Sequence, residues 1–163
     1  HVAKAKTKLA FNPGSMQLRS GVQKLKPILR QTNILFLNKE EAELLTGLTE
    51  DIKTLLKGMT KLGPRIAVLT DGSKGSFVYD GEAFYHMPVL PAPIIERTGC
   101  GDGFGTAFTA AMCLNKDIKE ALRWGSADAA GVIQHIGPQD GLMRRNQVEK
   151  LIRRNSKIRP VRI

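Results

Sequence analysis

Cysteine is scarce in this sequence of 163 residues, since Cys100 and Cys113 are the only two. Two cysteines are too few for a disulfide framework and lack the paired spacing of a zinc site, so a reducing cytoplasm is the expected location. The chain also lacks a run of about 18 apolar residues, and we therefore expect no membrane-spanning helix and no membrane partner. Internal repeats and low-complexity linkers are absent, so residues 1–163 are predicted to form a single domain.

Acidic residues are nearly missing from the two ends of the chain, although the formal net charge of the whole is +10. Residues 1–30 hold seven basic and no acidic residues, and residues 144–163 hold eight basic residues and one acidic residue. The centre, residues 31–143, has ten basic and fourteen acidic residues and is therefore net acidic. A nucleic-acid-binding module would have to depend on the ends alone. We keep it as a remote alternative and expect no nucleic-acid partner.

Short apolar runs alternate with helical patterns along the chain. The expected strands cover residues 8–11, 33–37, 65–70, 76–79 and 83–86. The expected helices cover residues 15–29 with a kink at Pro27, 40–45, 49–62, a stretch through Leu114 after the glycine-rich turn at 99–105, 117–133 and 147–154. Asp80-Gly81 between two alternating apolar runs is a strong hairpin signal. This order predicts an α/β fold with a mostly parallel sheet, helices on both faces and one antiparallel hairpin.

The most informative segment is Thr98-Gly-Cys-Gly-Asp-Gly-Phe-Gly105, which runs directly into an apolar helix. The first N–H groups of a helix have no intrahelical acceptor, and the macrodipole adds roughly half a positive charge there. Glycine also permits close approach of a phosphate, so the turn is typical of an anion-binding site. The P-loop pattern Gly-x-x-x-x-Gly-Lys-Ser/Thr is absent. The dinucleotide pattern Gly-x-Gly-x-x-Gly/Ala fails because Phe104 and Thr106 stand at its sixth position.

Asp102 lies inside this turn, where its charge would repel a statically bound pyrophosphate. A carboxylate beside an anion hole has a use if it takes the proton from a nucleophile that then attacks the phosphate. The segment therefore predicts a phosphotransferase whose acceptor is a hydroxyl group.

The segment resembles the Asp-Thr-x-Gly-Ala-Gly-Asp signature of the ribokinase/PfkB-type carbohydrate and nucleoside kinases, with Glu96-Arg97-Thr98-Gly99-Cys100-Gly101-Asp102 in its place. Three further motifs fit the family in order and spacing. They are Asn38-Lys39-Glu40-Glu41, Thr70-Asp71-Gly72-Ser73-Lys74-Gly75, and Ser126-Ala127-Asp128-Ala129-Ala130 leading to Gly137-Pro138. The resemblance covers about residues 8–155 and implies a ribokinase-like three-layer αβα fold.

The resemblance also implies a role for each matching residue. Asp102 would be the general base that takes the proton from the substrate hydroxyl. The anion hole for the γ-phosphate would consist of the N–H groups of Gly99, Cys100, Gly101 and Asp102. Asn38 and Glu41 would organise Mg²⁺, and the nucleotide-binding residues would be Thr70, Gly72, Ser73, Gly75 and Asp128. ATP and Mg²⁺ are thus the implied cofactors, and a sugar or a nucleoside is the implied small-molecule substrate.

Some positions depart from the family pattern. Glu96 and Arg97 replace the Asp-Thr of the signature, which weakens the expectation of the monovalent-cation site that the family places behind the anion hole. Cys100 stands for Ala and is expected to be a small buried residue, and Asp128 stands where Asn is usual. The chain is also much shorter than family members. It resembles their C-terminal, ATP-binding and catalytic part, with the N-terminal part absent.

The missing part leaves several interpretations open. The chain is interpreted as a sugar kinase, and the alternatives are a nucleoside kinase of the same family or a catalytically incomplete nucleotide-binding fragment. The same absence would leave one edge of the sheet open, and an open edge invites pairing with another chain. A homo-oligomer or a separate N-terminal half is therefore the expected macromolecular partner.

Overall fold

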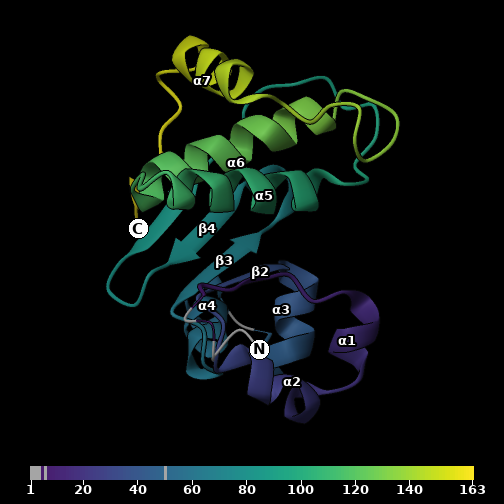
Figure 1. The fold of residues 1–163 in the computed structure, drawn as a ribbon, viewed down its shortest axis with the longest axis vertical. Coiled ribbons are helices and arrows are strands. Elements are labelled where there is room, and N and C mark those ends of the chain that lie inside the picture. Colours follow the sequence, from purple (N-terminus) through teal and green to yellow (C-terminus); the bar gives the residue numbers. More distant parts are fainter. Residues whose placement is uncertain (1–4, 6, 50) are drawn as a thin grey trace. The chain divides into compact units, whose positions relative to one another are not determined.

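The computed structural model describes residues 5, 7–49 and 51–163, and the chain divides into two compact units (Figure 1). The first unit holds the residues up to 71 together with 77–85 and 162–163. The second unit holds residues 72–76 and 86–161. Within the described part of the chain, no helix is both long and apolar enough to cross a membrane.

The secondary structure follows the expected alternation. In chain order the strands are β1 (Ala10–Phe11), β2 (Ile34–Asn38), β3 (Ile66–Thr70), β4 (Ser76–Tyr79), β5 (Phe84–Met87) and β6 (Val161–Arg162). The α-helices are α1 (Ser15–Arg19), α2 (Val22–Leu29), α3 (Lys39–Thr46), α4 (Ile52–Lys61), α5 (Cys100–Cys113), α6 (Ile118–Val132) and α7 (Arg145–Arg154). A short 3-10 helix, η1, covers Gly72–Lys74.

The six strands form one sheet in the order β1-β2-β3-β4-β5-β6. Strands β1, β2 and β3 run parallel, with Ile34 of β2 opposite Ile66 of β3. β4 and β5 are joined by a tight turn in which the Asp80 carboxylate accepts hydrogen bonds from the N–H groups of Glu82 and Ala83. So short a connection makes this pair an antiparallel hairpin. The predicted α/β fold with a mostly parallel sheet and one antiparallel hairpin is confirmed.

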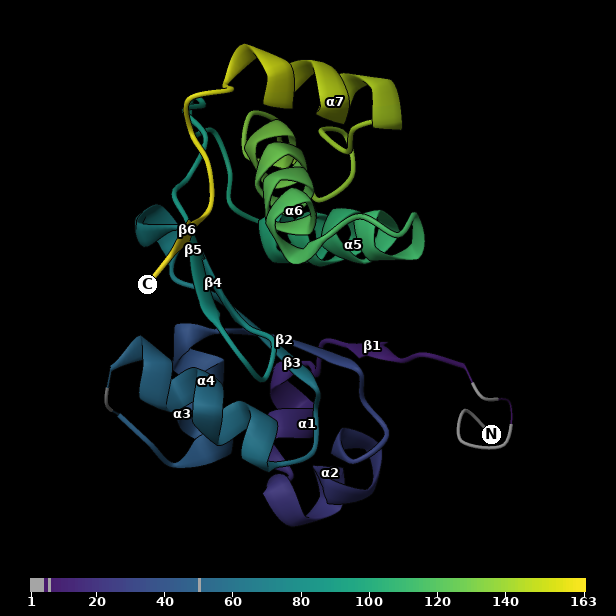
Figure 2. The same ribbon diagram turned by 90° about the vertical axis from the view of Figure 1, so that its left-hand side faces the viewer.

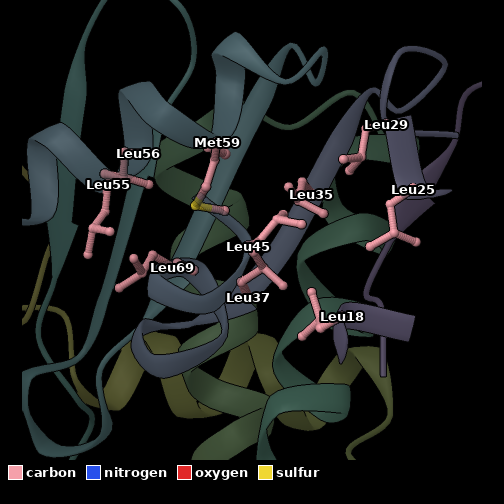
Figure 3. Packing of buried hydrophobic residues seen from close by; sticks show 12 residues of the cluster. Leu18, Leu25, Leu29, Leu35, Leu37, Leu45, Leu55, Leu56, Met59 and Leu69 are labelled. Carbon is pink, nitrogen blue, oxygen red and sulfur yellow. The ribbon is translucent and has the colours of Figure 1, made fainter. Parts of the chain in front are cut away.

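The core of the first unit is a cluster of leucines and small apolar residues (Figure 3). All residues of β2 before Asn38 are buried, as is typical of a strand covered on both faces. Leu35 and Leu37 are two positions apart and therefore lie on one face of the strand. They belong to the same cluster as Leu45 of α3 and Met59 of α4. This packing holds the carboxyl end of β2 and the start of α3 in place.

In the second unit, α5 and α6 pack closely because glycine stands where they meet (Figure 2). A Cβ atom added to Gly125 of α6 would lie 2.8 Å from the ring of Phe104 on α5, so no larger residue fits there. Phe104 stacks on Phe108 with 6.1 Å between the ring centroids, and both are buried. α7 contacts α6 and buries Val148 and Ile152. The N-terminus of α5 is thus carried by a tightly packed helix.

The helical stretch over residues 15–29 differs from the expectation. The predicted single helix is wrong, because the stretch is broken at Gly21, and Pro27 lies inside the second of the two helices, α2. Gly21 has a φ of +92°, a backbone conformation that ends a helix and that glycine adopts readily. The stretch therefore forms two helices.

Two further differences from the expected elements involve specific hydrogen bonds. α4 begins after Asp51 and not at Thr49, since the Asp51 carboxylate accepts hydrogen bonds from the N–H groups of Lys53 and Thr54 and caps the helix. β6 is not among the expected strands. It adds to the sheet beside β5, where the N–H of Ile163 donates to the carbonyl oxygen of Phe84 at 3.0 Å.

Leu45→Ala should lower the free energy of unfolding by about 2–5 kcal/mol, because it leaves a cavity in a packed core. Leu45 is 5% exposed within the cluster of the first unit. The matched control is Leu44→Ala, since Leu44 precedes it on α3 and is 58% exposed. That change should stay within about 0.5 kcal/mol. Urea unfolding followed by circular dichroism measures both, and equal losses in the two variants would contradict this packing.

Candidate functional site

The glycine-rich turn forms the N-terminus of α5. Gly99 is the N-cap, with a φ of +82° in the left-handed region. Its carbonyl oxygen accepts the first α-helical hydrogen bond, from the N–H of Gly103 at 2.9 Å. The N–H groups of residues 100–102 therefore precede the intrahelical ladder, where the helix dipole is positive. The N–H of Cys100 donates to the carbonyl oxygen of Arg97 at 3.3 Å, which tightens the turn.

The two glycines on either side of Cys100 have different surroundings. A Cβ atom added to Gly99 would lie 2.6 Å from Cβ and 2.7 Å from Cα of Pro138, so the backbone of the turn is pressed against the segment that follows α6. A Cβ atom added to Gly101 would meet nothing within 4 Å. Gly99 is required by packing and by its positive φ, whereas Gly101 leaves the helix end open to solvent.

The charged groups of the turn are the side chains of Arg97 and Asp102, and both residues are exposed. Burial raises the pKa of the Cys100 thiol, and the positive charge of Arg97 opposes this only in part. The thiol is therefore protonated at neutral pH, and Cys100 is half-buried, which corrects the expectation of a buried residue. The turn thus carries the Asp102 carboxylate on the first turn of a helix whose end favours anions.

Asp128 of α6 is buried, with 4% of its surface exposed. Its Oδ1 atom accepts a hydrogen bond from the N–H of Met143 at 2.8 Å, and its Oδ2 atom lies 2.9 Å from the position of a Cβ added to Gly103. Burial raises the pKa of Asp128, and the hydrogen bond from Met143 acts in the opposite direction. The carboxylate thus connects α6 to the segment before α7, beside the first turn of α5.

The second glycine-bearing motif follows β3. Thr70 ends that strand, and Gly72 and Ser73 lie in η1, where both are exposed. Gly75 is buried with a φ of +90°, and a Cβ atom there would collide with the carbonyl oxygen of Met87. Residues 72–75 are therefore held against β5, which leaves the side chain of Ser73 on the surface.

His86 of β5 holds the same motif from its side chain, a contact that no sequence motif signalled. Its Nε2 atom is 2.8 Å from the carbonyl oxygen of Lys74. His86 and residues 72–75 belong to the second unit. His86 and Lys74 are 12 positions apart and are brought together by the hairpin, so no local sequence pattern predicts their hydrogen bond.

Asn38 and Glu41 are brought together at the carboxyl end of β2. The Asn38 side chain accepts a hydrogen bond from the N–H of Glu41 at 2.8 Å, and Oε2 of Glu41 accepts one from the N–H of Asn38 at 2.9 Å. This reciprocal pair is a capping box at the start of α3. Asn38 is also the register partner of Thr70, so the ends of β2 and β3 meet. Among residues 5, 7–49 and 51–163, no group of three or more His, Cys, Asp or Glu side chains forms a metal site.

The predicted site residues thus fall into two groups. Asn38, Glu41 and Thr70 lie together in the first unit. The second unit holds residues 72–75, residues 99–102 and Asp128. Glu96 lies in the second unit as well and accepts a hydrogen bond from the N–H of Gly137 at 2.8 Å, a contact that no sequence motif signals.

Comparison with known proteins places these features in a family. The model of the pfkB carbohydrate kinase family matches residues 1–145. An uncharacterized sugar kinase of Archaeoglobus fulgidus is 29% identical over 136 residues, which are 83% of this chain and 54% of that protein. The cytidine kinase of Thermococcus kodakarensis is 34% identical over 115 residues, which are 69% of this chain and 41% of that protein.

A solved structure shows the same likeness. Ribokinase of Arabidopsis thaliana, complexed with ribose and ATP, matches with a TM-score of 0.81 and 30% identity, over 93% of this chain and 49% of that chain. The ribokinase-like fold implied by the motifs is therefore confirmed. The chain spans about half the length of the proteins it matches.

Gly99→Ala should lower the free energy of unfolding by about 1–3 kcal/mol or more, because the methyl group meets Pro138 and the backbone has a positive φ. Gly101→Ala is the matched control, since its methyl group enters open space and alanine favours a helix. That variant should be as stable as the wild type, or more stable by up to about 1 kcal/mol. Thermal and urea unfolding measure both. A stable Gly99→Ala variant would refute the close contact with Pro138.

Proposed function

Because the chain belongs to the pfkB family of carbohydrate kinases, we propose that it serves ATP-dependent phosphoryl transfer to a hydroxyl group of a sugar or nucleoside. The observation that carries this proposal is the N-terminus of α5, where a glycine backbone and the exposed Asp102 lie on the same first helical turn. A positive helix end binds the charge of a phosphate, and a carboxylate beside it accepts a proton.

In the proposed reaction, Asp102 takes the proton from the acceptor hydroxyl as its oxygen attacks the γ-phosphorus of ATP. The bond from the γ-phosphorus to the bridging oxygen breaks, and ADP leaves with that electron pair. The backbone of residues 99–102 and the dipole of α5 stabilise the negative charge on the transferred group. Phosphoryl transfer depends mainly on such positioning and charge stabilisation, so a rigid helix end is suited to it.

Asn38 and Glu41 are the residues that we assign to Mg²⁺. Their oxygen atoms are of the type that this ion prefers, and Mg²⁺ commonly keeps several water molecules and binds through one or two carboxylates plus phosphate oxygens. The capping box fixes both side chains, with one Glu41 oxygen bonded to the N–H of Asn38. Bound Mg²⁺ would neutralise charge on the phosphate oxygens.

The remaining motif residues are assigned to the nucleotide. The exposed turn contains Gly72 and Ser73, and Thr70 and Gly75 flank it in the sequence. Met87 and His86 fix the backbone of this segment, which supports a role in contacting ATP. Asp128 is different, because its carboxylate is buried and bonded to the N–H of Met143. These contacts support a role in ordering the segment before α7 near the nucleotide.

A second candidate is nucleotide binding without transfer. It is favoured by one observation, that the chain spans about half the length of its relatives. Relatives include both a sugar kinase and a cytidine kinase, so the acceptor class is tested with a panel of sugars and nucleosides. ATP with Mg²⁺ should raise the melting temperature under both candidates. Phosphorylation of a panel member supports transfer, and a thermal shift without any product supports binding alone.

Asp102→Asn should keep the thermal shift with ATP and Mg²⁺ and lower turnover by about 10²–10⁴-fold, because general base action contributes that much. The matched control is Asp117→Asn. Asp117 caps α6 and follows the far end of α5, a helix of 14 residues and so about 20 Å long, and asparagine caps a helix equally well. Turnover of the control should equal that of the wild type. Near-normal turnover of Asp102→Asn would remove Asp102 from the mechanism.

Glu41→Gln separates the metal role of Glu41 from its cap. Glutamine also completes a capping box, so the free energy of unfolding should change by less than about 0.5 kcal/mol. The Mg²⁺ concentration that gives half of the thermal shift with ATP should rise by about 10- to 100-fold, as for ligands that act through metal-bound water. Glu40→Gln, an exposed neighbour on the same helical turn, is the control and should change neither. An unchanged Mg²⁺ requirement in Glu41→Gln would show that Glu41 only caps α3 and does not act on the metal.

A further inference from the structure

Glu96 is the first residue of the glycine-rich signature, at a position where the family usually has Asp. Its Oε2 atom accepts a hydrogen bond from the N–H of Gly137 at 2.8 Å. The side chain of Thr98 also hydrogen-bonds to the Glu96 carboxylate. The carboxylate therefore has donors on two sides, one from its own segment and one from a residue 41 positions later in the chain.

Backbone contacts join the same two segments on either side of this carboxylate. The N–H groups of Ile95 and Glu96 both approach the carbonyl oxygen of Ile133, at 2.9 and 3.3 Å. Farther along, Gly99 meets Pro138 at distances that leave no room for a side chain. Segment 95–99 and segment 133–138 thus run together from the end of α6 to the start of α5, and all of these residues belong to the second unit.

The order of the contacts matters for the glycine-rich turn. Gly137 has a φ of +92° and is followed directly by Pro138. The hydrogen bond from the N–H of Gly137 to Glu96 therefore fixes the residue next to Pro138, which contacts Gly99. Gly99 itself has a left-handed backbone, and such a conformation persists only where the surroundings determine it. Proline supplies a rigid surface there, because its ring restricts its own backbone. The position of Pro138 is therefore one of the surroundings that hold Gly99.

We propose that Glu96 is a positioning residue for the anion hole: its carboxylate fixes Gly137 and Pro138 against the turn and so holds the backbone of residues 99–102 in its binding conformation. The proposal rests on the proposed function in one respect, that residues 99–102 receive the γ-phosphate. Glu96 itself acts through Gly137 and Thr98. The hydrogen bonds from Thr98 and Gly137 lower the pKa of the Glu96 carboxyl, so it is ionised at neutral pH, and hydrogen bonds to an ionised acceptor are the stronger kind.

The test compares Glu96→Gln with Glu149→Gln in the same chain. Glu149 is a matched control because its pKa is also lowered by a hydrogen bond, here from Arg145 on α7, in an exposed ion pair. Two-dimensional NMR of the amide groups detects the hydrogen bond between Gly137 and Glu96, and it needs no acceptor substrate. In the wild type the Gly137 amide shift should titrate with a pKa below that of an ordinary glutamate, and in Glu96→Gln this titration should disappear. Hydrogen exchange of Cys100, Gly103 and Gly137, whose N–H groups donate to Arg97, Gly99 and Glu96, should become about tenfold faster in Glu96→Gln only.

The kinetic readout uses the acceptor that the panel identifies. Glu96→Gln should lower kcat by about 10- to 100-fold with an unchanged KM for ATP, because small displacements of a catalytic frame can cost about 100-fold. Loss of the Gly137 titration in Glu96→Gln with unchanged exchange at Cys100 and Gly103 would overturn the positioning role. A raised KM for ATP with unchanged kcat would also overturn it, since Glu96 would then support binding alone. If the wild type transfers no phosphate, the proposed function fails, while the two amide measurements still decide whether Glu96 holds the turn.

Discussion

The contact between Gly99 and Pro138 is the constraint on which the candidate site depends. A backbone at a positive φ has to lie within van der Waals distance of a proline ring, so the start of α5 cannot be placed without the segment that follows α6. That segment is placed in turn by the packing of α6 on α5, where the absence of a side chain at Gly125 leaves room for the ring of Phe104. Both ends of this arrangement use glycine to remove side-chain volume. The backbone conformation at the start of α5 is therefore a product of close packing behind it.

The first unit combines structure and chemistry in a different way. Asn38 and Glu41 form a capping box, and these are the residues that the family pattern assigns to the metal. The two roles are compatible because a carboxylate has two oxygens and the cap uses only one of them. The cap also restricts both side chains, so a metal would meet ligands that are already ordered. A substitution that removes the side chain would affect stability and chemistry together, and only an isosteric change distinguishes them.

The sequence predicts this fold and the location of the site better than it predicts what holds the site. Strands β2 and β3, the hairpin at Asp80 and the glycine turn have local signals in apolar runs and turn residues, and all of them appear in the structure. The break at Gly21 within residues 15–29 is not expected from the sequence, because a single glycine is tolerated inside a helical pattern and its positive φ is known only from the structure. The bond from Gly137 to Glu96 joins residues 41 positions apart, and no local pattern encodes such a contact.

The replacement of the usual Asp by Glu96 acquires a physical reason from these contacts. Glutamate is longer by one methylene group, and its carboxylate reaches the N–H of Gly137 in the opposite segment while it also bonds to Thr98. Its negative charge is thus met by an N–H and an O–H donor of the chain itself, and the same bonds order the segment that supports Gly99. The contacts of Glu96 thus lie between two segments of the second unit, behind the turn that carries Asp102.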